Sequence, residues 1–335
     1  MRLSNNPLPV LILFGPTASG KTDLLLRLFG PGADRLCDAE IVSADSMQVY
    51  RGMDIGTAKP SAQERALLPH HLIDIRNPNE QFSVGDFVRL ANDAIADIAS
   101  RGALPVVSGG TGFYLKNCVL GLPESPPSDA AIREALKREL REKGVAALME
   151  ELARSDPHSA EKIHPNDEYR LLRALEVLRL SGRPLSSFGL SGAAPANASP
   201  SRPPCRFLVV GLFRPREELY RRINDRCATM FAHGLPDEVR RLHEAGYSPN
   251  DPGLRAIGYR EFFVEDERSS SDDHGSYRLS QDIDGVQALV AQNSRRYAKR
   301  QITFFASLPD AKKIMAGKDD VETAQRLRVE LKGFL

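Results

Sequence analysis

The chain has 335 residues, of which 41% are hydrophobic and 27% are charged, and its formal net charge is +1. The length exceeds the roughly 100 to 200 residues of a typical single domain and leaves room for one large domain with an insertion. The composition is close to average globular usage, which excludes global disorder and permits a sizeable core. A balanced charge does not exclude a nucleic-acid partner, because only local charge meets the phosphates.

The four cysteines, Cys37, Cys118, Cys205 and Cys227, are scattered and include no C-x-x-C pair. This spacing predicts neither a zinc site nor a disulfide framework, and it fits a reducing cytoplasm. The N-terminal apolar run from Leu8 to Phe14 is far shorter than the roughly 20 residues that span a bilayer, and no small-residue cleavage site follows it. We therefore expect a cytoplasmic protein with no membrane association.

Short apolar segments alternate with helical stretches through much of the chain. The run at 8–14 ends in a glycine-rich stretch, and leucines over 22–29 then suit a helix. Further buried strands are predicted at 41–44, 104–107 and 207–212, with helical stretches such as 88–100 between them. This alternation predicts an α/β fold with a mostly parallel sheet flanked by helices.

The pattern changes between 122 and 204, where charged amphipathic stretches at 129–143 and 166–180 replace the short apolar strands. We interpret 122–204 as a helical insertion domain between two parts of the core, 1–121 and 205–335. The insertion ends in a Ser-, Gly-, Ala- and Pro-rich tract from Ser186 to Pro204, which is typical of a flexible connector. A second polar stretch, Glu265 to Ser276, predicts a surface loop.

One motif carries explicit chemistry. It matches G-x-x-x-x-G-K-[ST] between a predicted strand and a predicted helix, as Gly15-Pro16-Thr17-Ala18-Ser19-Gly20-Lys21-Thr22. The glycines let successive backbone N–H groups curl around phosphate oxygens, while the helix N-terminus and Lys21 add positive charge. The Thr22 hydroxyl is a candidate ligand for Mg²⁺. The sequence therefore predicts a P-loop NTPase-like core with a phosphate or pyrophosphate site.

A P-loop alone does not decide the reaction, because kinases, hydrolases and transferases of diphosphate-bearing substrates share it. Asp45 and Asp74 each follow an apolar segment, so either can serve a metal. Asp45 also lies at a predicted carboxyl end beside the P-loop, where ligands collect in doubly wound sheets. It is thus a candidate general base or Mg²⁺ ligand, and helix capping by Asp45 or Ser46 is the alternative.

Gly109-Gly110-Thr111-Gly112 follows another predicted strand, where a close backbone and a free hydroxyl can meet the same diphosphate; a simple turn explains these residues equally well. His70, His71, His158 and His164 have no carboxylate or cysteine partners at ligand spacing, so we interpret them as structural. These residues do not by themselves select a reaction.

Positive charge is locally concentrated in two places. Between 202 and 226 there are seven arginines against three acidic residues. Near the C-terminus, Arg295-Arg296-Tyr297-Ala298-Lys299-Arg300 contains four cations and an aromatic without an acid. Such a helix suits an RNA surface, and a solvated helix face is the alternative.

These residues resemble those of the tRNA dimethylallyltransferases, also called tRNA isopentenyltransferases. The resemblance extends from about residue 8 to 305 and includes motifs in the family's order: Phe14 to Thr22, Val42 to Pro60, Pro69 to Ile75, Gly109 to Thr111, Ile163 to Asp167, Arg170 to Glu176, Gly258 to Arg260 and Ala298 to Thr303. It implies an enzyme of the bacterial type that transfers a dimethylallyl group to the exocyclic N6 amine of the adenosine on the 3′ side of the anticodon.

The resemblance also implies roles for individual residues. The P-loop holds dimethylallyl diphosphate and not ATP, Mg²⁺ assists the departure of diphosphate, and Asp45 is the general base. Thr111 touches the diphosphate and the amine, and an arginine of the 219–226 helix, most plausibly Arg222, neutralises the leaving group. The family suggests a monomer.

For the anticodon stem-loop of tRNA, the resemblance implies contacts in several segments. They are Asp45, Ser46, Met47 and Gln48; Thr111; Arg133; Tyr169, Arg170, Leu171, Leu172 and Arg173; Arg255, Ala256, Ile257, Gly258, Tyr259 and Arg260; and Arg295, Arg296, Tyr297, Ala298, Lys299, Arg300, Gln301 and Ile302. An enzyme acting on such a base extrudes it from its stack into a channel.

The chain departs from the family where Phe304-Phe305-Ala306-Ser307 replaces the usual tryptophan and arginine, so one RNA contact is in doubt. Three alternatives stay open at this point. A nucleotide or small-molecule kinase shares the P-loop but consumes ATP, an adenylate isopentenyltransferase uses the same chemistry on a free nucleotide, and an RNA-binding module has no catalytic function.

Overall fold

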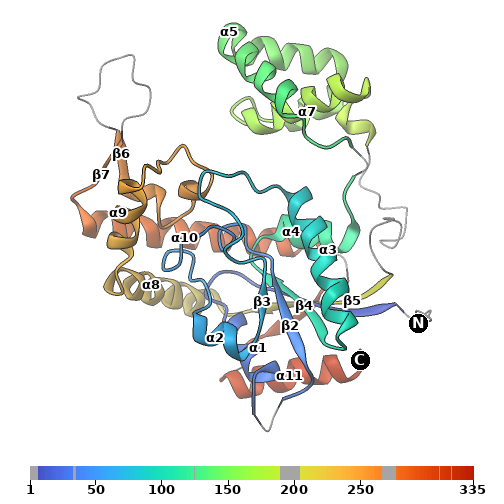
Figure 1. Ribbon diagram of the computed structural model, residues 1–335, viewed down its shortest axis with the longest axis vertical. Helices are drawn as coiled ribbons and strands as arrows, with labels where there is room; N and C mark the ends of the chain where they lie inside the picture. The colour runs from blue at the N-terminus through green and yellow to red at the C-terminus, as the bar shows by residue number, and fades with distance from the viewer. Residues whose placement is uncertain are drawn as a thin grey trace. The chain divides into compact units, whose positions relative to one another are not determined.

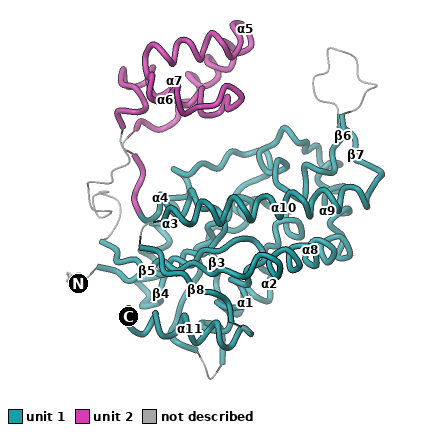
Figure 2. The backbone as a smooth tube through the Cα atoms, turned by 180° about the vertical axis from the view of Figure 1, so that it is seen from behind, with its two compact units in different colours: residues 1–119, 199–335 teal, residues 120–198 magenta. Residues whose placement is uncertain are grey.

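The computed structural model describes residues 7–32, 35–123, 125–188, 204–265, 277–308, 310–317 and 319–335. The chain forms two compact units, which are residues 1–119 with 199–335 and residues 120–198 (Figure 2). Most of the predicted connector Ser186 to Pro204 and of the predicted loop Glu265 to Ser276 lies outside the described residues.

A six-stranded sheet forms the centre of the first unit (Figure 1). Its order is β3-β2-β4-β1-β5-β8, and every pairing in it is parallel. The strands are β1 (Leu8–Phe14), β2 (Ala39–Ser43), β3 (His70–His71), β4 (Leu104–Gly109), β5 (Cys205–Phe213) and β8 (Lys312–Met315). The predicted α/β class with a mostly parallel sheet is confirmed. The sequence reading missed β3 and β8, which are the two edge strands.

Parallel pairing brings the functional loops to one edge of the sheet. In β1, Leu13 pairs with Ser108 of β4 on one side and with Val210 of β5 on the other. The segments that follow β1, β2, β4 and β5 therefore all leave the sheet at its carboxyl edge, where ligands bind in such folds. These segments contain the P-loop, Asp45, Gly110 and Arg214 in turn.

Helices cover the sheet and extend from it, as Figure 1 shows. In the first unit they are α1 (Lys21–Phe29), α2 (Ala62–Leu67), α3 (Val84–Ser100), α4 (Gly112–Leu120), α8 (Arg216–Ala232), α9 (Leu235–Glu244), α10 (Ile283–Phe305) and α11 (Asp320–Lys332). A short antiparallel pair, β6 (Phe263–Glu265) with β7 (Tyr277–Leu279), adds a separate ribbon. Among the described residues, no helix is long and apolar enough to cross a membrane.

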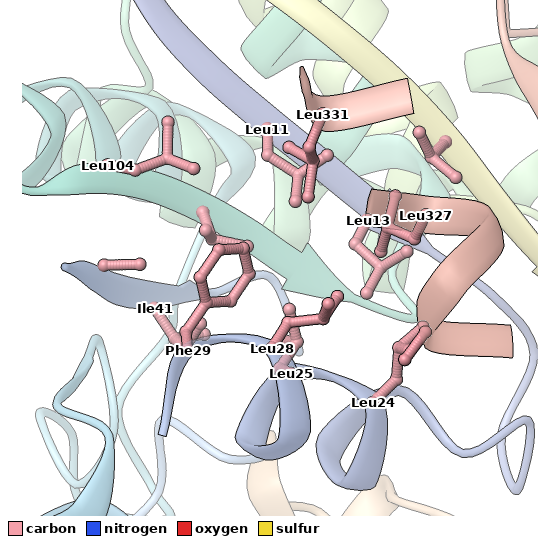
Figure 3. Packing of buried hydrophobic residues seen from close by; sticks show 14 of the residues in the cluster. Leu11, Leu13, Leu24, Leu25, Leu28, Phe29, Ile41, Leu104, Leu327 and Leu331 are labelled. Atoms are coloured by element: carbon pink, nitrogen blue, oxygen red, sulfur yellow. The ribbon is translucent and has the colours of Figure 1, made fainter. Parts of the chain in front are cut away.

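The core beneath the P-loop joins β1 to α1, which follows it in the chain, and to α11, which lies near the C-terminus (Figure 3). Leu11 and Leu13 of β1 pack in one cluster with Leu24 and Leu28 of α1 and with Leu327 of α11. All five side chains are at most 2% exposed. This packing fixes α1, and with it the end of the P-loop, against the sheet.

The second unit is helical, with α5 (Ala130–Ser155), α6 (Pro157–Lys162) and α7 (Glu168–Ser181) around its own core. Its predicted helices are present, but α5 continues past the predicted end at Lys143. Gly144 adopts φ 76° there, a left-handed conformation that glycine tolerates, so the helix breaks and then resumes. Buried leucines of α5 and α7, such as Leu148 and Leu171, pack together in this core.

We predict that Leu327→Ala lowers the free energy of unfolding of the first unit by about 2 to 5 kcal/mol, because it removes a fully buried side chain from this core. Val329 lies on the same helix and is 71% exposed, so Val329→Ala is the matched control and should change it by less than about 0.5 kcal/mol. Urea unfolding followed by far-UV circular dichroism measures the free energy of unfolding of both variants. Equal effects of the two substitutions would contradict the packing of α11.

Candidate active site

A cavity of about 1070 Å³ opens at the carboxyl edge of the sheet in the first unit. It is lined by the P-loop from Thr17 to Thr22, by Asp45 and neighbouring residues after β2, by Gly109 and Gly110 after β4, and by residues of α8 and α10. The structure thus brings together the three sequence motifs that were singled out for phosphate chemistry.

The P-loop has the local conformation that anion binding requires. Ala18 and Gly20 adopt φ angles of 63° and 93°, and α1 begins at Lys21 directly after them. Positive φ values turn successive peptide units inward, so that their N–H groups can point at one anion in front of the helix N-terminus. The Ser19 hydroxyl is buried with no hydrogen-bond partner among the described residues, which leaves another donor inside the loop.

Lys21 is partly buried and folds back on its own loop. Its Nζ donates to the carbonyl oxygens of Gly15 and Pro16, at 2.8 and 3.1 Å. Burial and the nearby Arg226 guanidinium lower the pKa of Lys21 to about 8, although the Asp45 carboxylate opposes the shift. The carbonyls of Gly15 and Pro16 are neutral, so an entering anion would give this ammonium a negatively charged partner.

Two arginines brace the outside of the loop. Arg214 Nε donates to the Ser19 carbonyl oxygen at 2.8 Å, and Arg222 Nε donates to the Ala18 carbonyl oxygen at 2.9 Å. These bonds tie two backbone carbonyls of the loop to α8 and to the segment that precedes it. Arg222, which the resemblance assigns to the leaving group, therefore has a structural task and also lines the cavity.

Arg226 lies one helical turn after Arg222 and also lines the cavity. Its guanidinium makes no hydrogen bond or ion pair within the described part of the chain, and burial lowers its pKa while Asp45 opposes that effect. A desolvated cation without a partner costs free energy unless an anion joins it. The resemblance implies an arginine of the 219–226 helix for the leaving group and favours Arg222 over Arg226; the i, i+4 spacing of the two residues places both on one face of the helix.

Asp45 follows β2 and forms a turn with its own chain. Its Oδ1 accepts hydrogen bonds from the N–H groups of Met47 at 2.9 Å and Gln48 at 3.4 Å. Its other oxygen makes no hydrogen bond among the described residues, so it is available to a substrate. Asp45 also acts electrostatically on Lys21 and Arg226, which places this carboxylate in the same field as the cations.

Thr111 is placed behind Asp45 and does not line the cavity. Its Oγ1 accepts a hydrogen bond from the Ser46 N–H at 3.0 Å and donates to the Ser46 Oγ at 3.3 Å, while its own N–H donates to the Ala44 carbonyl at 3.1 Å. Gly109 lies so close to Ala44 that a Cβ would clash with its carbonyl. The structure therefore shows Thr111 holding the Asp45 loop in place.

The long helix α10 contributes buried and exposed faces. Ala298, Gln301 and Phe305 are buried at a spacing of three to four residues, whereas Arg296 and Lys299 are exposed. Tyr297 lines the cavity, where burial and the charge of Asp45 raise its pKa to about 12, although Thr111, Arg300 and Gln301 act in the opposite direction. The basic stretch is therefore a two-faced helix, on which Arg296 and Lys299 are exposed and Arg300 reaches the cavity.

The loop after β2 is held by a residue that the sequence reading did not identify. Glu238 of α9 is 2% exposed, and its carboxylate accepts hydrogen bonds from the backbone N–H groups of residues 54–56 at 2.9 to 3.1 Å. The Tyr259 hydroxyl donates to Glu238 Oε1 at 2.6 Å, and its ring leaves no space for a Cβ at Gly56. No motif marks Glu238, because its partners are backbone atoms of a distant segment.

The proposed RNA-contacting residues of the first unit divide into two groups. Arg255, Ile257, Arg260, Tyr297 and Arg300 line the cavity. The side chains of Tyr259 and Ala298 are fully buried and pack inside the fold, and the expectation that these residues contact RNA stays a prediction.

The second unit contains the other predicted RNA-contacting residues. Arg133 pairs with the fully buried Glu176 at 3.2 Å and lies 4.6 Å from the ring centroid of Tyr169, which is 64% exposed. Arg173 also pairs with Glu176, at 2.8 Å. In contrast, the side chains of Leu171 and Leu172 belong to the core, and the expectation that these residues contact RNA stays a prediction. Figure 1 shows α7, which carries Tyr169, Leu171 and Arg173, beside α5, which carries Arg133.

The structure bears on which side chains could bind Mg²⁺ in the cavity. Asp74 pairs with Lys59 at 2.6 Å and Arg65 at 3.0 Å and does not line the cavity, which removes it as a metal ligand there. Within the ranges that the structure describes, no group of three or more His, Cys, Asp or Glu side chains could hold a metal ion. A magnesium ion at Thr22 would thus depend on oxygens of a bound diphosphate, as Mg²⁺ commonly does at phosphate sites.

We predict that the contribution of Lys21 to binding inorganic pyrophosphate declines as the pH rises through about 8, because its ammonium then loses its proton. The affinity ratio between the wild type and Lys21→Met should therefore be largest near pH 7 and shrink toward pH 9.5. Titration calorimetry across this range measures the ratio, in which the titration of pyrophosphate itself cancels. A ratio that stays constant with pH would exclude the lowered pKa.

We also predict that Arg226→Gln weakens pyrophosphate binding at least tenfold, since it removes a desolvated cation from the anion site. Arg221 lies on the same helix and is exposed, so Arg221→Gln is the matched control and should change the affinity less than about twofold. Calorimetry at a fixed pH of 7 tests both variants. Equal losses would mean that Arg226 acts only through long-range charge.

Comparisons with known proteins place the chain. The family model described as IPP transferase matches residues 48–308. The chain is 44% identical over 303 residues to a protein of Geobacter sulfurreducens named tRNA dimethylallyltransferase, covering 90% of each chain. A tRNA isopentenylpyrophosphate transferase from Bacillus halodurans has 34% identity and a TM-score of 0.64, over 98% of this chain and 96% of that one.

A structure of a eukaryotic dimethylallyltransferase acting on tRNA aligns with a TM-score of 0.76 over 97% of this chain and 79% of that one, but at 24% identity this likeness concerns the fold alone. The family match and the relatives of high coverage agree with each other and with the site at the carboxyl edge of the sheet. The chain therefore belongs to the IPP transferase family.

Proposed function

We propose that this protein transfers a dimethylallyl group from dimethylallyl diphosphate to the N6 amine of the adenosine on the 3′ side of the anticodon in tRNA, and releases diphosphate. One observation carries the proposal. A P-loop and a carboxylate with a free oxygen line the same cavity, as expected for an enzyme that joins a leaving diphosphate to an attacking amine. Its relatives are named for this transfer.

The donor end of the reaction is electrostatic. As the bond between the allylic carbon and the diphosphate oxygen breaks, negative charge grows on the diphosphate and positive charge on the allylic group. The P-loop, Lys21 and Arg226 line the cavity, where they would stabilise the departing anion, and Lys21 would exchange its bonds to the Gly15 and Pro16 carbonyls for the diphosphate. Arg222 would hold the loop in this shape through its bond to Ala18.

The acceptor end needs a base. The lone pair of an adenine amine is delocalised into the ring, so removing its proton while the new C–N bond forms lowers the barrier. The free oxygen of Asp45 can accept that proton, which contributes roughly 10² to 10⁴ in rate. Thr111 keeps Asp45 in position through Ser46.

Magnesium is also part of the proposal. Thr22 in the first turn of α1 would hold the ion together with diphosphate oxygens, and the bound ion would neutralise charge on the leaving group. The donor hydroxyl of Ser19 and the cations of the loop are available to the same anion.

The RNA would approach the cavity over the exposed cations of α10 and the arginines at 255 and 260. A base extruded from the anticodon loop can enter the cavity between these groups, where its amine would meet Asp45. The exposed Tyr169 with Arg133 offers a stacking surface in the second unit. We further propose that the enzyme acts as a monomer in the cytoplasm.

We predict that Asp45→Asn retains tRNA binding but lowers the rate of prenyl transfer by about 10² to 10⁴, because the amide preserves the turn and cannot accept the proton. Single-turnover transfer from dimethylallyl diphosphate and a filter-binding measurement with the anticodon stem-loop test the two halves separately. Turnover near that of the wild type would remove Asp45 from the role of base.

A calorimetric titration controls for the kinase alternative. Dimethylallyl diphosphate should bind more tightly than ATP, and ATP should not be consumed when the stem-loop is added. Tight binding and hydrolysis of ATP would contradict the proposed donor.

A further inference from the structure

One side chain spans the two loops on which the proposed chemistry depends. Gln301 of α10 is 5% exposed. Its Oε1 accepts a hydrogen bond from the backbone N–H of Thr17 at 3.0 Å, and its Nε2 donates to the backbone carbonyl of Gly110 at 2.8 Å. A single amide thus joins the P-loop after β1 to the loop after β4.

The direction of this amide follows from its partners. A backbone N–H can only donate and a carbonyl can only accept, so the oxygen of Gln301 must face Thr17 and its nitrogen must face Gly110. The approach is also close, because a Cβ at Gly110 would clash with Gln301 Nε2. This contact explains why glycine occupies position 110 and why an amide, with one donor end and one acceptor end, occupies position 301.

Each loop carries one half of the proposed reaction. Thr17 belongs to the loop that would grip the diphosphate. Gly110 precedes Thr111, whose hydroxyl holds the Ser46 N–H beside Asp45. Tyr297, one turn earlier on α10, lies close enough to both Thr111 and Gln301 for them to lower its pKa against the larger effect of burial.

We propose that Gln301 is a positioning residue, which holds the diphosphate loop and the Asp45–Thr111 loop at the spacing that the transfer step requires. This inference rests on the proposed function. It differs from the role that the family resemblance implies for Gln301, which is a contact to RNA. A displacement of about 1 Å between reacting groups can cost up to about 10² in rate, so the effect should appear in the catalytic step.

The first test replaces Gln301 with methionine, which has a similar length and can neither donate nor accept these bonds. We expect Gln301→Met to lower kcat about ten- to hundredfold, while the KM for the stem-loop and the affinity for pyrophosphate stay within about threefold. Thr303→Ala is the matched control on the exposed side of the same helix and should preserve kcat.

The second test is Gln301→Glu. A carboxylate retains the bond from Thr17 but cannot donate to Gly110, and a protonated carboxyl can again donate. Burial raises the pKa of such a carboxyl, so the ratio of variant to wild-type kcat should increase several-fold as the pH falls from 8 to 5.5. The titratable and charged groups that line the same cavity include Tyr297, Asp45, Lys21, Arg226 and Arg300, and their own titration cancels in the ratio.

The outcomes separate the possible roles. A lowered kcat in Gln301→Met together with the pH-dependent recovery of Gln301→Glu supports the proposal. An unchanged kcat with a raised KM for the stem-loop would assign Gln301 to RNA binding and overturn the proposal. A pH-independent ratio of Gln301→Glu to wild-type kcat, with both variants only lowering the melting temperature, would also overturn it. If the wild type itself transfers no prenyl group, the proposed function fails first, independently of Gln301.

Discussion

The parallel register of β1 between β4 and β5 is the constraint on which the site depends. Because all three strands run the same way, the P-loop, the Gly110 loop and the start of the arginine-bearing segment leave the sheet at one edge. β2 adds Asp45 beside them through its pairing with β4. No single segment contains both the anion site and the carboxylate. Their proximity is a property of the sheet.

Burial then gives the charges their chemical character. Lys21 and Arg226 lie where desolvation lowers their pKa values, and the carboxylate of Asp45 partly offsets this shift for both. A site with more buried positive charge than its own acid can neutralise binds anions, and it favours a state in which charge grows on a leaving group. Arg214 and Arg222 serve the same site differently, because they hold the carbonyls behind the loop.

The sequence predicted those parts whose signals are local. The β1 strand, the P-loop and α1 follow from an apolar run, a glycine pattern and a leucine period within one segment, and the position of Asp45 follows from the end of a strand. Glu238, Gln301 and Arg226 could not be assigned their places in this way. The first two bind backbone atoms of distant segments, and the third is notable only for the partners that it lacks. The edge strands β3 and β8 are short and carry weak patterns.

A motif also does not tell which of its residues are exposed to an RNA partner. A motif identifies a segment, but the helical period decides which of its residues face outward. Thus Lys299 is exposed on α10 while Ala298 is buried, and Tyr259 supports Glu238 from the interior.

The central claim is that this cavity joins a prenyl diphosphate to an adenine amine in RNA. The most direct measurement is the transfer of radiolabel from dimethylallyl diphosphate to an unmodified anticodon stem-loop, run beside AMP as the acceptor. We expect one label per stem-loop, on the adenosine 3′ to the anticodon, and none on AMP. Labelling of AMP, or of neither acceptor, would contradict it.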